Sequence, residues 1–272
     1  MMQDVEAHGF RIPMVGLGTW ALRGRNCTRV VEQAIRAGYR HIDTAQMYEN
    51  EREVGEGVRA SGMRAEVVVG TKVPPERLQP HDLERSVKQS LGLLRLEVID
   101  LLLIHWPNPR VPLAETLGAM ADLKRAGYVK QIGVSNFTVA LIDEAIKVSG
   151  TPLVCNQFEC HPFLDQDKLI AATRKAGMAV VAYSPIARGN AKGNEVLQRV
   201  GKAHDKTAAQ VCLRWLTQQG IAVIPRTSKV ERLTENIDVL DFDLTDAEMK
   251  EIAALARPGG RIVDWTWSPK WD

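Results

Sequence analysis

Three side chains suited to acid–base chemistry each stand at the end of a predicted buried strand. Asp43 ends the first of these strands, Lys72 follows 29 residues later, and His105 follows after a further 33 residues. One strand–helix unit of a parallel α/β protein is about this long, so consecutive strands should present the three side chains at the same rim of the sheet. Tyr48, in the loop after Asp43, should join them there. Together these side chains are candidates for proton transfer.

The same four residues should influence one another's charge. Lys72 and Asp43 would pair in a partly buried site, and we expect that cation to make the Tyr48 phenol easier to ionise. An unperturbed phenol has a pKa of about 10, which is too high for efficient proton exchange near neutrality. Considered one at a time, such residues more often have structural roles: an Asp in a turn or helix cap, a Lys on the solvated surface and a His packed in the core. Their joint position at strand ends favours catalysis.

Apolar runs alternate with helical periodicity along the whole chain. The strands should lie at residues 15–20, 39–42, 67–71, 98–104, 132–134, 153–155, 178–182 and 221–224. The helices should lie at residues 26–36, 51–60, 82–94, 113–125, 141–148, 165–175, 207–218, 230–240 and 246–255, with a polar Gly/Asn loop before residue 207. Strands that are apolar throughout are buried on both faces, which is typical of parallel sheets. Eight strand–helix units in 272 residues favour a closed (β/α)8 barrel, an α/β TIM barrel, over the alternative of a doubly wound open sheet.

Several local features refine this expectation. Residues 5–14, around His8-Gly9, should form an N-terminal β-hairpin, and two extra helices should accompany the eight units. Asn50 should cap the helix that follows it, and His41 should face the barrel wall. The chain has no linker or change of composition, so we expect a single barrel domain over residues 1–272.

Composition excludes several classes of protein. The chain is 45% apolar and 25% charged with a net charge of +2 and no long basic block, which argues against a nucleic-acid or anionic-membrane partner. Its apolar runs are shorter than the roughly 18 residues that span a bilayer, and the N-terminus lacks the apolar core of a signal peptide. The four cysteines show no zinc-site spacing, so we expect reduced core residues of a cytoplasmic protein and no metal. We also expect the protein to be a monomer.

Six motifs resemble those of one known family. They are Asp43-Thr-Ala-x-x-Tyr48-x-Asn-Glu, Lys72, Leu-Leu-Ile-His105-Trp, Gly133-Val-Ser-Asn-Phe, Asn156-Gln157 and Ile224-Pro-Arg-Thr227. In this order, and over the whole chain, they resemble the aldo-keto reductases. The compact loops and the ending Ser268-Pro-Lys-Trp-Asp272 resemble the bacterial 2,5-diketogluconate and methylglyoxal reductases within that family.

The resemblance implies an NADPH-dependent oxidoreductase that reduces aldehydes, ketones or dicarbonyls to alcohols. Tyr48 would be the general acid, Lys72 paired with Asp43 would perturb its pKa, and His105 would orient the carbonyl. Trp20 and Trp106 would line the substrate mouth with Tyr48 and His105. At the nicotinamide end of the cofactor, the carboxamide would be held by Ser135, Asn136 and Gln157, and the ring would stack on Tyr183 with Ser184 and Pro185 beside it. At the other end, the 2′-phosphate would be held by Arg226, Thr227, Ser228 and Arg232. Asn236 would lie near the adenine. The short connection at residues 108–112 favours small or polar carbonyl substrates.

Other interpretations remain open. Residues 16–21 match the dinucleotide fingerprint, but they lack its acidic partner and are interpreted as a turn at the first barrel loop. A barrel that holds NADPH as a redox sensor or accessory subunit is one alternative function, and an unrelated barrel hydrolase is another. His161 is interpreted as structural, and Trp265 and Trp267 as either core residues or a tail that closes the pocket.

Overall fold

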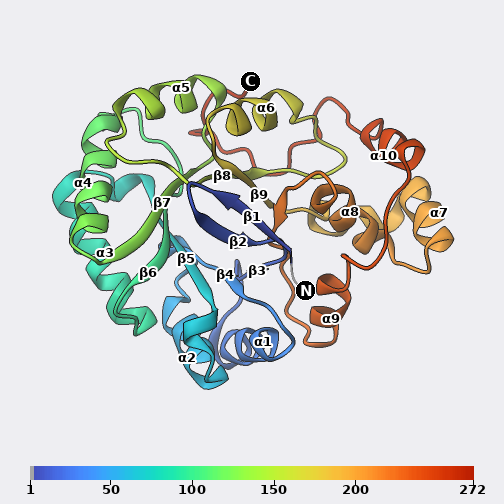
Figure 1. Ribbon diagram of the computed structural model, residues 1–272, viewed down its shortest axis with the longest axis horizontal. Helices are drawn as coiled ribbons and strands as arrows, with labels where there is room; N and C mark the ends of the chain where they lie inside the picture. Colours follow the sequence, from blue (N-terminus) through green and yellow to red (C-terminus); the bar gives the residue numbers. More distant parts are fainter. Residues whose placement is uncertain (1–2) are drawn as a thin grey trace.

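The computed structural model describes residues 3–272 and shows a ring of strands surrounded by helices (Figure 1). Eight strands pair side by side in chain order, all of them parallel: β3 (Leu17–Gly18), β4 (His41–Asp43), β5 (Val68–Val73), β6 (Ile99–Ile104), β7 (Val129–Ser135), β8 (Cys155–Glu159), β9 (Ala179–Tyr183) and β10 (Ala222–Val223). Parallel bridges from Val15 to Val223 and from Gly18 to Arg226 join the first strand to the last. The predicted (β/α)8 barrel is therefore confirmed, and the open sheet is not.

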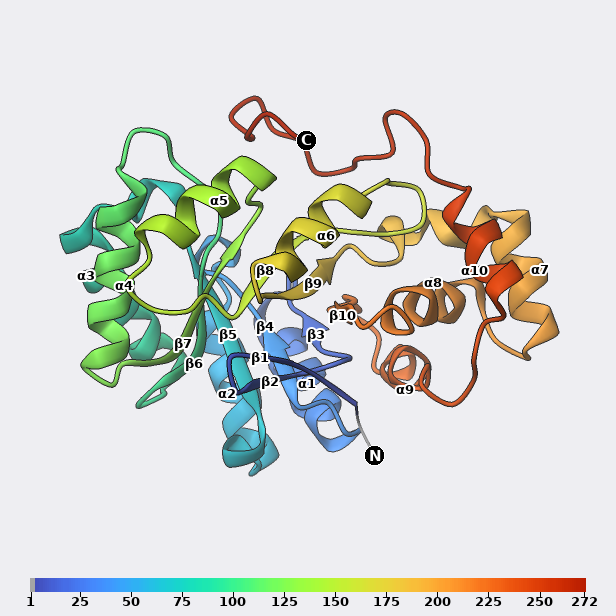
Figure 2. The ribbon, with the colours of Figure 1, turned by 45° about the horizontal axis from the view of Figure 1, so that its top comes forward.

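Helices cover the outside of the ring. One follows each strand: α1 (Gly24–Arg36), α2 (Glu51–Ser61), α3 (Pro80–Leu94), α4 (Leu113–Arg125), α5 (Val139–Val148), α6 (Asp167–Lys175), α8 (Ala208–Thr217) and α9 (Glu231–Ile237). Two more, α7 (Glu195–Ala203) and α10 (Asp246–Ala253), lie next to each other at one side of the barrel (Figure 2). Among residues 3–272, no helix is long and apolar enough to cross a membrane.

The core forms because the strands are apolar on both faces. In β6, Leu102 packs outward against the helices, whereas Leu103 packs into a second cluster inside the barrel. Full burial of each such side chain contributes about 1.5–3 kcal/mol. The helices bury one stripe each, as in α1, where Cys27, Val30 and Ala34 face the sheet at helical spacing. The sheet therefore separates an outer core from an inner one.

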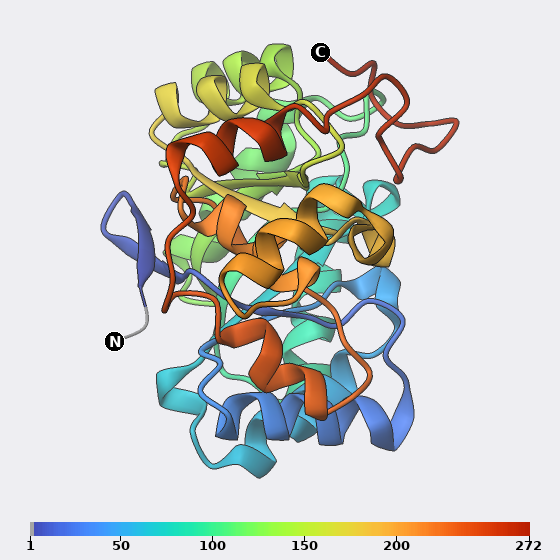
Figure 3. The same cartoon turned by 90° about the vertical axis from the view of Figure 1, so that its right-hand side faces the viewer.

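An antiparallel hairpin closes one end of the inner core. Strands β1 (Asp4–Ala7) and β2 (Phe10–Pro13) are joined by the two-residue turn His8-Gly9. Both turn residues have positive φ, 50° and 76°, as a tight type I′ hairpin turn requires. Ala7 and Ile12 pack into the inner cluster. Figure 3 shows the hairpin and the C-terminal tail on opposite sides of the molecule, so the end of the barrel that lies opposite the hairpin is the one left for a site.

Two helix assignments from the sequence need correction. The predicted loop before residue 207 contains α7, which begins where the Asn194 side chain accepts a hydrogen bond from the Leu197 N–H at 3.0 Å. Asn50 does precede α2, but its side chain makes no cap. Its amide instead donates to the carbonyls of Thr19 (2.8 Å) and Leu22 (3.1 Å), so it fastens the first loop to the second.

Two strand expectations also differ from the structure. The predicted strand at 153–155 is displaced to β8, because Asn156 and Gln157 are buried polar residues within the strand rather than a loop after it. His41 faces the barrel interior, where a Cβ atom on Gly16 would lie 2.7 Å from its Nδ1. Side chains two apart lie on the same face of a strand, so His41 and Asp43 point the same way. Burial lowers the pKa of His41 to about 4, so its ring is neutral near pH 7.

Candidate active site

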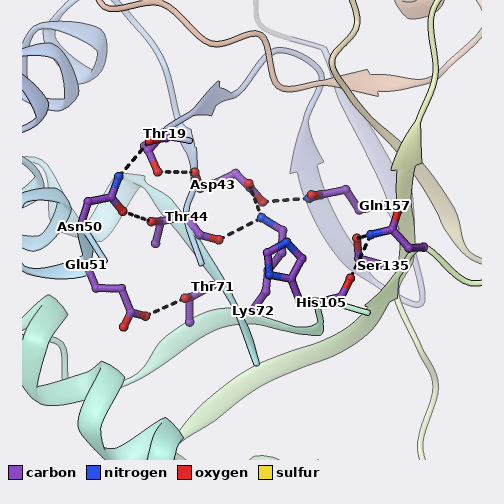
Figure 4. A network of polar contacts seen from close by, with 11 residues as sticks. Thr19, Asp43, Thr44, Asn50, Glu51, Thr71, Lys72, His105, Ser135 and Gln157 are labelled. Carbon is purple, nitrogen blue, oxygen red and sulfur yellow. Dashed lines mark hydrogen bonds and ion pairs between the residues drawn. The ribbon is translucent and has the colours of Figure 1, made fainter. Parts of the chain in front are cut away.

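Four predicted residues meet at the carboxyl ends of β4, β5 and β6. Lys72 Nζ lies 2.5 Å from Asp43 Oδ1 and donates to the Thr44 carbonyl at 2.9 Å (Figure 4). Tyr48 ends a short 3-10 turn (Gln46–Tyr48), and its ring lies 5.1 Å from Lys72 Nζ. The His105 ring stands edge-on to that of Tyr48, with 5.6 Å between centroids. The strand-end spacing therefore predicted a real spatial cluster.

A frame of amides holds this cluster from the side of β7 and β8. Gln157 Nε2 donates to Asp43 Oδ2 at 2.8 Å, so both carboxylate oxygens are engaged. Asn136, in a left-handed conformation with φ of 61°, donates to the His105 carbonyl at 2.9 Å and to Ser135 Oγ at 3.1 Å. Its Oδ1 accepts the Tyr183 hydroxyl at 2.8 Å. Ser135, Asn136, Gln157 and Tyr183 are thus brought together, as predicted.

Burial controls the protonation states of the site. Desolvation raises the pKa of Tyr48 above its ordinary value, and the charge of Asp43 raises it further. The net shift is therefore upward, because Lys72 is engaged by Asp43 and does not bring this pKa down toward neutrality. Burial also lowers the pKa of His105 well below its ordinary range, with Lys72 adding to the effect. Near neutral pH, Tyr48 is a protonated phenol and His105 a neutral imidazole.

A cavity of about 470 Å³ opens onto these groups. Tyr48 and His105 line it, and so do Trp20, Asp43, Trp106, Asn136, Gln157, Tyr183, Ser184, Pro185, Arg226 and Arg232 of the predicted residues. Lys72 and Ser135 lie behind this lining and contact Asp43 and Asn136. Their absence from the wall agrees with their burial, 0% and 1% exposed.

Three predicted cofactor residues do not line the cavity. Thr227 folds its hydroxyl back onto Lys229, accepting from its N–H at 3.0 Å and donating to its carbonyl at 3.1 Å. Ser228 contributes a carbonyl that accepts from Asn26 at 3.4 Å. Asn236 is buried on α9 at 4% exposure. The segment after β10 therefore presents Arg226 and Arg232 to the cavity rather than all five predicted side chains.

Sequence reasoning missed part of the lining. Arg188 and Lys192 come from the loop after β9, and Val263 from the C-terminal tail. Arg188 stacks over Trp20, with 4.7 Å from its guanidinium carbon to the ring centroid. A basic residue beside Gly189 just after a strand end was an available signal for Arg188. Val263 carries no such signal, because nothing in its type or spacing marks it.

Comparison with known proteins places this geometry in a family. The model of the aldo/keto reductase family matches residues 14–257. The methylglyoxal reductase DkgB of Escherichia coli O157:H7 is 37% identical over 265 residues, covering 96% of this chain and 99% of its own. The 2,5-diketo-D-gluconic acid reductase B of Corynebacterium sp. (strain SHS752001) is 41% identical over 252 residues, covering 92% and 90%.

Solved structures agree with the sequence comparisons. The aldose reductase of Schistosoma japonicum superposes with a TM-score of 0.90 at 30% identity, covering 94% of each chain. An aldo-keto reductase from a Medee basin deep-sea metagenome library superposes with a TM-score of 0.91 at 34% identity, covering 97% of each chain. These likenesses extend over nearly the full barrel and include the strands that carry the site. The chain is therefore an oxidoreductase that belongs to the aldo-keto reductase family.

Proposed function

We propose that this protein reduces aldehydes, ketones or dicarbonyls to alcohols with NADPH, within one barrel domain that functions as a monomer. The observation that carries the proposal is the pairing of a protonated phenol with a neutral imidazole at the floor of one cavity, 5.6 Å apart between ring centroids. A reduction needs a proton at the carbonyl oxygen, and Tyr48 is the group that holds one there. His105 supplies the hydrogen bond that orients the same oxygen.

The buried pair behind the phenol has a supporting role. Burial is the main cause of the raised pKa of Tyr48, and the negative charge of Asp43 is the second. Without a compensating cation, Asp43 would make the tyrosinate still harder to form. Lys72, 2.5 Å from Asp43, offsets that charge. Gln157 fixes the second carboxylate oxygen, so the pair keeps one geometry beneath the phenol.

The donor set of the cavity fits an anionic dinucleotide. Arg188, Lys192, Arg226 and Arg232 all line it, and such cations suit phosphate groups. Gly18 in this wall allows the first strand to pack closely on the last, because a Cβ atom there would lie 2.7 Å from the Ile224 carbonyl oxygen. NADPH, when bound, supplies the hydride for a carbonyl reduction. Asn136, Gln157 and Tyr183 would hold its nicotinamide end, and Arg226 and Arg232 its 2′-phosphate.

Substrate preference is inferred from the relatives and the mouth of the cavity. The relatives act, by name, on methylglyoxal and on 2,5-diketo-D-gluconic acid. Trp20, Met47, Trp106 and Trp265 surround the phenol with apolar surface. Small aldehydes and dicarbonyls are therefore the first substrates to test. The complete Asp43, Tyr48, Lys72 and His105 set disfavours the alternative of a redox sensor with little turnover.

The deciding experiment is a carbonyl panel followed by NADPH consumption for the wild type and for Tyr48→Phe. The variant removes only the phenolic oxygen, so turnover should fall about 10²–10⁴-fold. NADPH binding, measured by quenching of protein fluorescence, should stay near that of the wild type. Turnover of the variant within a few-fold of the wild type would remove Tyr48 from the role of acid.

The cofactor assignment has its own test. Replacing Arg232 by Leu removes one charge-assisted contact, so NADPH binding should weaken by roughly 10- to 150-fold while NADH binding hardly changes. Lys229→Leu, in the same segment but outside the cavity lining, is the matched control. Equal losses for both cofactors would instead assign Arg232 to the fold.

A further inference from the structure

A buried carboxylate on β8 takes no part in the proton chemistry described above. Glu159 is 0% exposed and lies two residues beyond Gln157, so both side chains point to the same side of the strand. Gln157 contacts Asp43, whereas Glu159 contacts the C-terminal tail. Strand β8 therefore touches both the catalytic frame and the last segment of the chain.

The Glu159 carboxylate binds two consecutive backbone amides of the tail. Its Oε1 accepts the Ile262 N–H at 2.6 Å, and its Oε2 accepts the Val263 N–H at 2.7 Å. His161 Nε2 lies 2.9 Å from the same Oε1, and His161 is itself 0% exposed. Hydrogen bonds of backbone N–H groups to an ionised acceptor are among the stronger ones, and a buried carboxylate needs them.

Arg261, a cation of the tail, interacts with the negative charge of Glu159. Burial lowers the pKa of Arg261, and the charge of Glu159 opposes that effect. The Arg261 guanidinium carbon lies 3.7 Å from the centroid of the Trp271 ring, further along the tail. We name residues 261–263, which Glu159 holds through the Ile262 and Val263 N–H groups, the tail clamp.

The last residue of the clamp and the segment that follows it form a wall of the cavity. Val263 and Trp265 line the same cavity as Tyr48 and His105. The tail has further anchors beyond this wall, toward its C-terminus. Trp267 packs edge-on against Trp106 at 5.1 Å, and the Asp272 carboxylate accepts the Val139 N–H at the start of α5 at 2.9 Å.

Besides the clamp, the wall is held by the stacking of Trp265 on Trp267, with 6.2 Å between ring centroids. Trp265 is 53% exposed, and its own hydrogen bonds run within the tail, to Ser268. The tail runs from α10 past α6 toward α5 without regular secondary structure (Figure 2). Its path beside the cavity therefore depends on single contacts, of which those to Glu159 are the most deeply buried.

We propose that Glu159 is a positioning residue, whose carboxylate holds Val263 and Trp265 against the cavity and thereby determines how well bulky carbonyl substrates bind. The inference rests on the proposed carbonyl reduction. It assigns Glu159 no contact with the reacting atoms. Its effect should appear in the binding of substrates that reach the wall, rather than in proton transfer from Tyr48.

Two sets of variants test the clamp, one at Glu159 on β8 and the other at Val263 on the tail. Glu159→Gln keeps the shape of the side chain, but an amide can accept only one of the two backbone N–H groups well. Val263→Pro deletes the N–H that Oε2 accepts, from the tail side and outside the barrel core. Val263→Ala is its matched control, because it trims the same side chain and retains the N–H.

The readout compares propanal with 3-phenylpropanal, which carry the same aldehyde but differ in bulk. Loss of one charge-assisted bond should raise KM for 3-phenylpropanal roughly three- to tenfold in Glu159→Gln and Val263→Pro. In Glu159→Gln, KM for propanal, kcat and NADPH binding should stay near wild-type values, and Val263→Ala should change KM for 3-phenylpropanal less than Val263→Pro does. Trypsin should also cleave after Arg261 faster once the clamp is broken.

The outcomes separate this inference from the proposed function. No turnover of either aldehyde by the wild type would overturn the proposed function, while the cleavage at Arg261 would still test the clamp. Wild-type turnover with an unchanged KM in Glu159→Gln would overturn the clamp alone. Parallel losses of kcat and NADPH binding would overturn it too, by showing that Glu159 supports the barrel. If Glu159→Gln fails to fold, the Val263 pair decides: equal behaviour of Val263→Pro and Val263→Ala overturns the proposal.

Discussion

Two buried aspartates, at opposite ends of the barrel strands, are both paired with cations. Asp43, at the end of β4, faces Lys72 at 2.5 Å, with side chains only 2% and 1% exposed. Asp100, near the start of β6, faces Arg64 and Lys130, each at 2.7 Å, but these cations are 30% and 55% exposed. Asp100 also accepts the Val69 N–H at 2.9 Å. Both sites pair an aspartate with cations, but the cations of Asp100 are exposed to water and Lys72 is buried.

This difference separates a functional pair from a structural one. Water and salt screen the cations of Asp100, and either one can leave while the other remains. Asp43 has a single cation, and both side chains are almost fully buried, so its charge and geometry are fixed together. Such a buried pair contributes little net stability, but it places a fixed pair of charges beneath Tyr48.

A third buried carboxylate sharpens the comparison because no cation bonds it directly. Glu51, at the start of α2, accepts the hydroxyls of Thr71 at 2.7 Å and Ser90 at 3.2 Å. Burial raises the pKa of Glu51 above its ordinary value, and these two hydroxyls only partly oppose the effect. Asp43, Glu51 and Asp100 thus differ in what compensates the buried carboxylate: one buried cation, two hydroxyl groups and two partly exposed cations, respectively.

The largest effect is expected from Lys72→Met. Removing the cation leaves the buried Asp43 carboxylate uncompensated, so the free energy of unfolding should fall by about 3–5 kcal/mol. Urea denaturation followed by circular dichroism measures this loss. Carbonyl reduction should fall with it. A loss no greater than that of Lys130→Met would show that the Asp43 charge is compensated without Lys72.

An intermediate effect, with a gain in stability at neutral pH, is expected from Glu51→Gln. A raised folded-state pKa means that the contribution of Glu51 to stability is full below its unfolded pKa and is lost as the pH rises through the folded one. A neutral amide escapes that loss, so the variant should be more stable than the wild type near pH 7 by about 1 kcal/mol. The gain should vanish in acid.

Thermal unfolding at several pH values tests this prediction, with Thr71→Val as a control that removes a hydroxyl donor but keeps the carboxylate. A gain that is independent of pH would assign the effect to packing. A loss at neutral pH would mean that the charge of Glu51 is better compensated than its two hydroxyl partners suggest.

The smallest effect is expected from Lys130→Met, the same substitution at the other aspartate. Arg64 still faces Asp100 in this variant, so the free energy of unfolding should change by about 0–1 kcal/mol, and less at high salt. Turnover should be unchanged. The double variant Arg64→Met/Lys130→Met should lose much more than the sum of the single losses, because only then is Asp100 left without a cation.

The sequence was sufficient for the barrel and for the four central side chains. Asp43, Lys72 and His105 could be predicted because a parallel barrel delivers each strand end to one rim, and the chain repeats at that interval. The displacement of β8 could not be foreseen in the same way. Asn156, Gln157 and Glu159 are all polar, and a strand that carries buried polar residues loses the apolar pattern by which strands are recognised.

The remaining errors have other physical causes. Arg188 and Val263 line the cavity from a loop and a tail, where no periodicity links sequence position to direction. The pKa of Tyr48 depends on how many protein atoms surround the phenol, which spacing does not give. Thr227 matches the family pattern, yet its hydroxyl bonds to Lys229 within its own turn. The roles of the predicted cofactor residues stay predictions until binding is measured.

Closure of the ring determines when this protein can fold during synthesis. Val15 pairs with Val223, and the inner cluster joins Ala7 and Ile12 of the hairpin to Ala222 and Ile224. Synthesis at about 5–20 residues per second would leave the hairpin without these partners for roughly ten seconds or more. Contacts so distant in sequence also slow folding. Until β10 emerges, the nascent chain therefore exposes an unpaired sheet edge and the apolar side chains of the hairpin. Chaperones that bind apolar segments have their clearest opportunity in that interval.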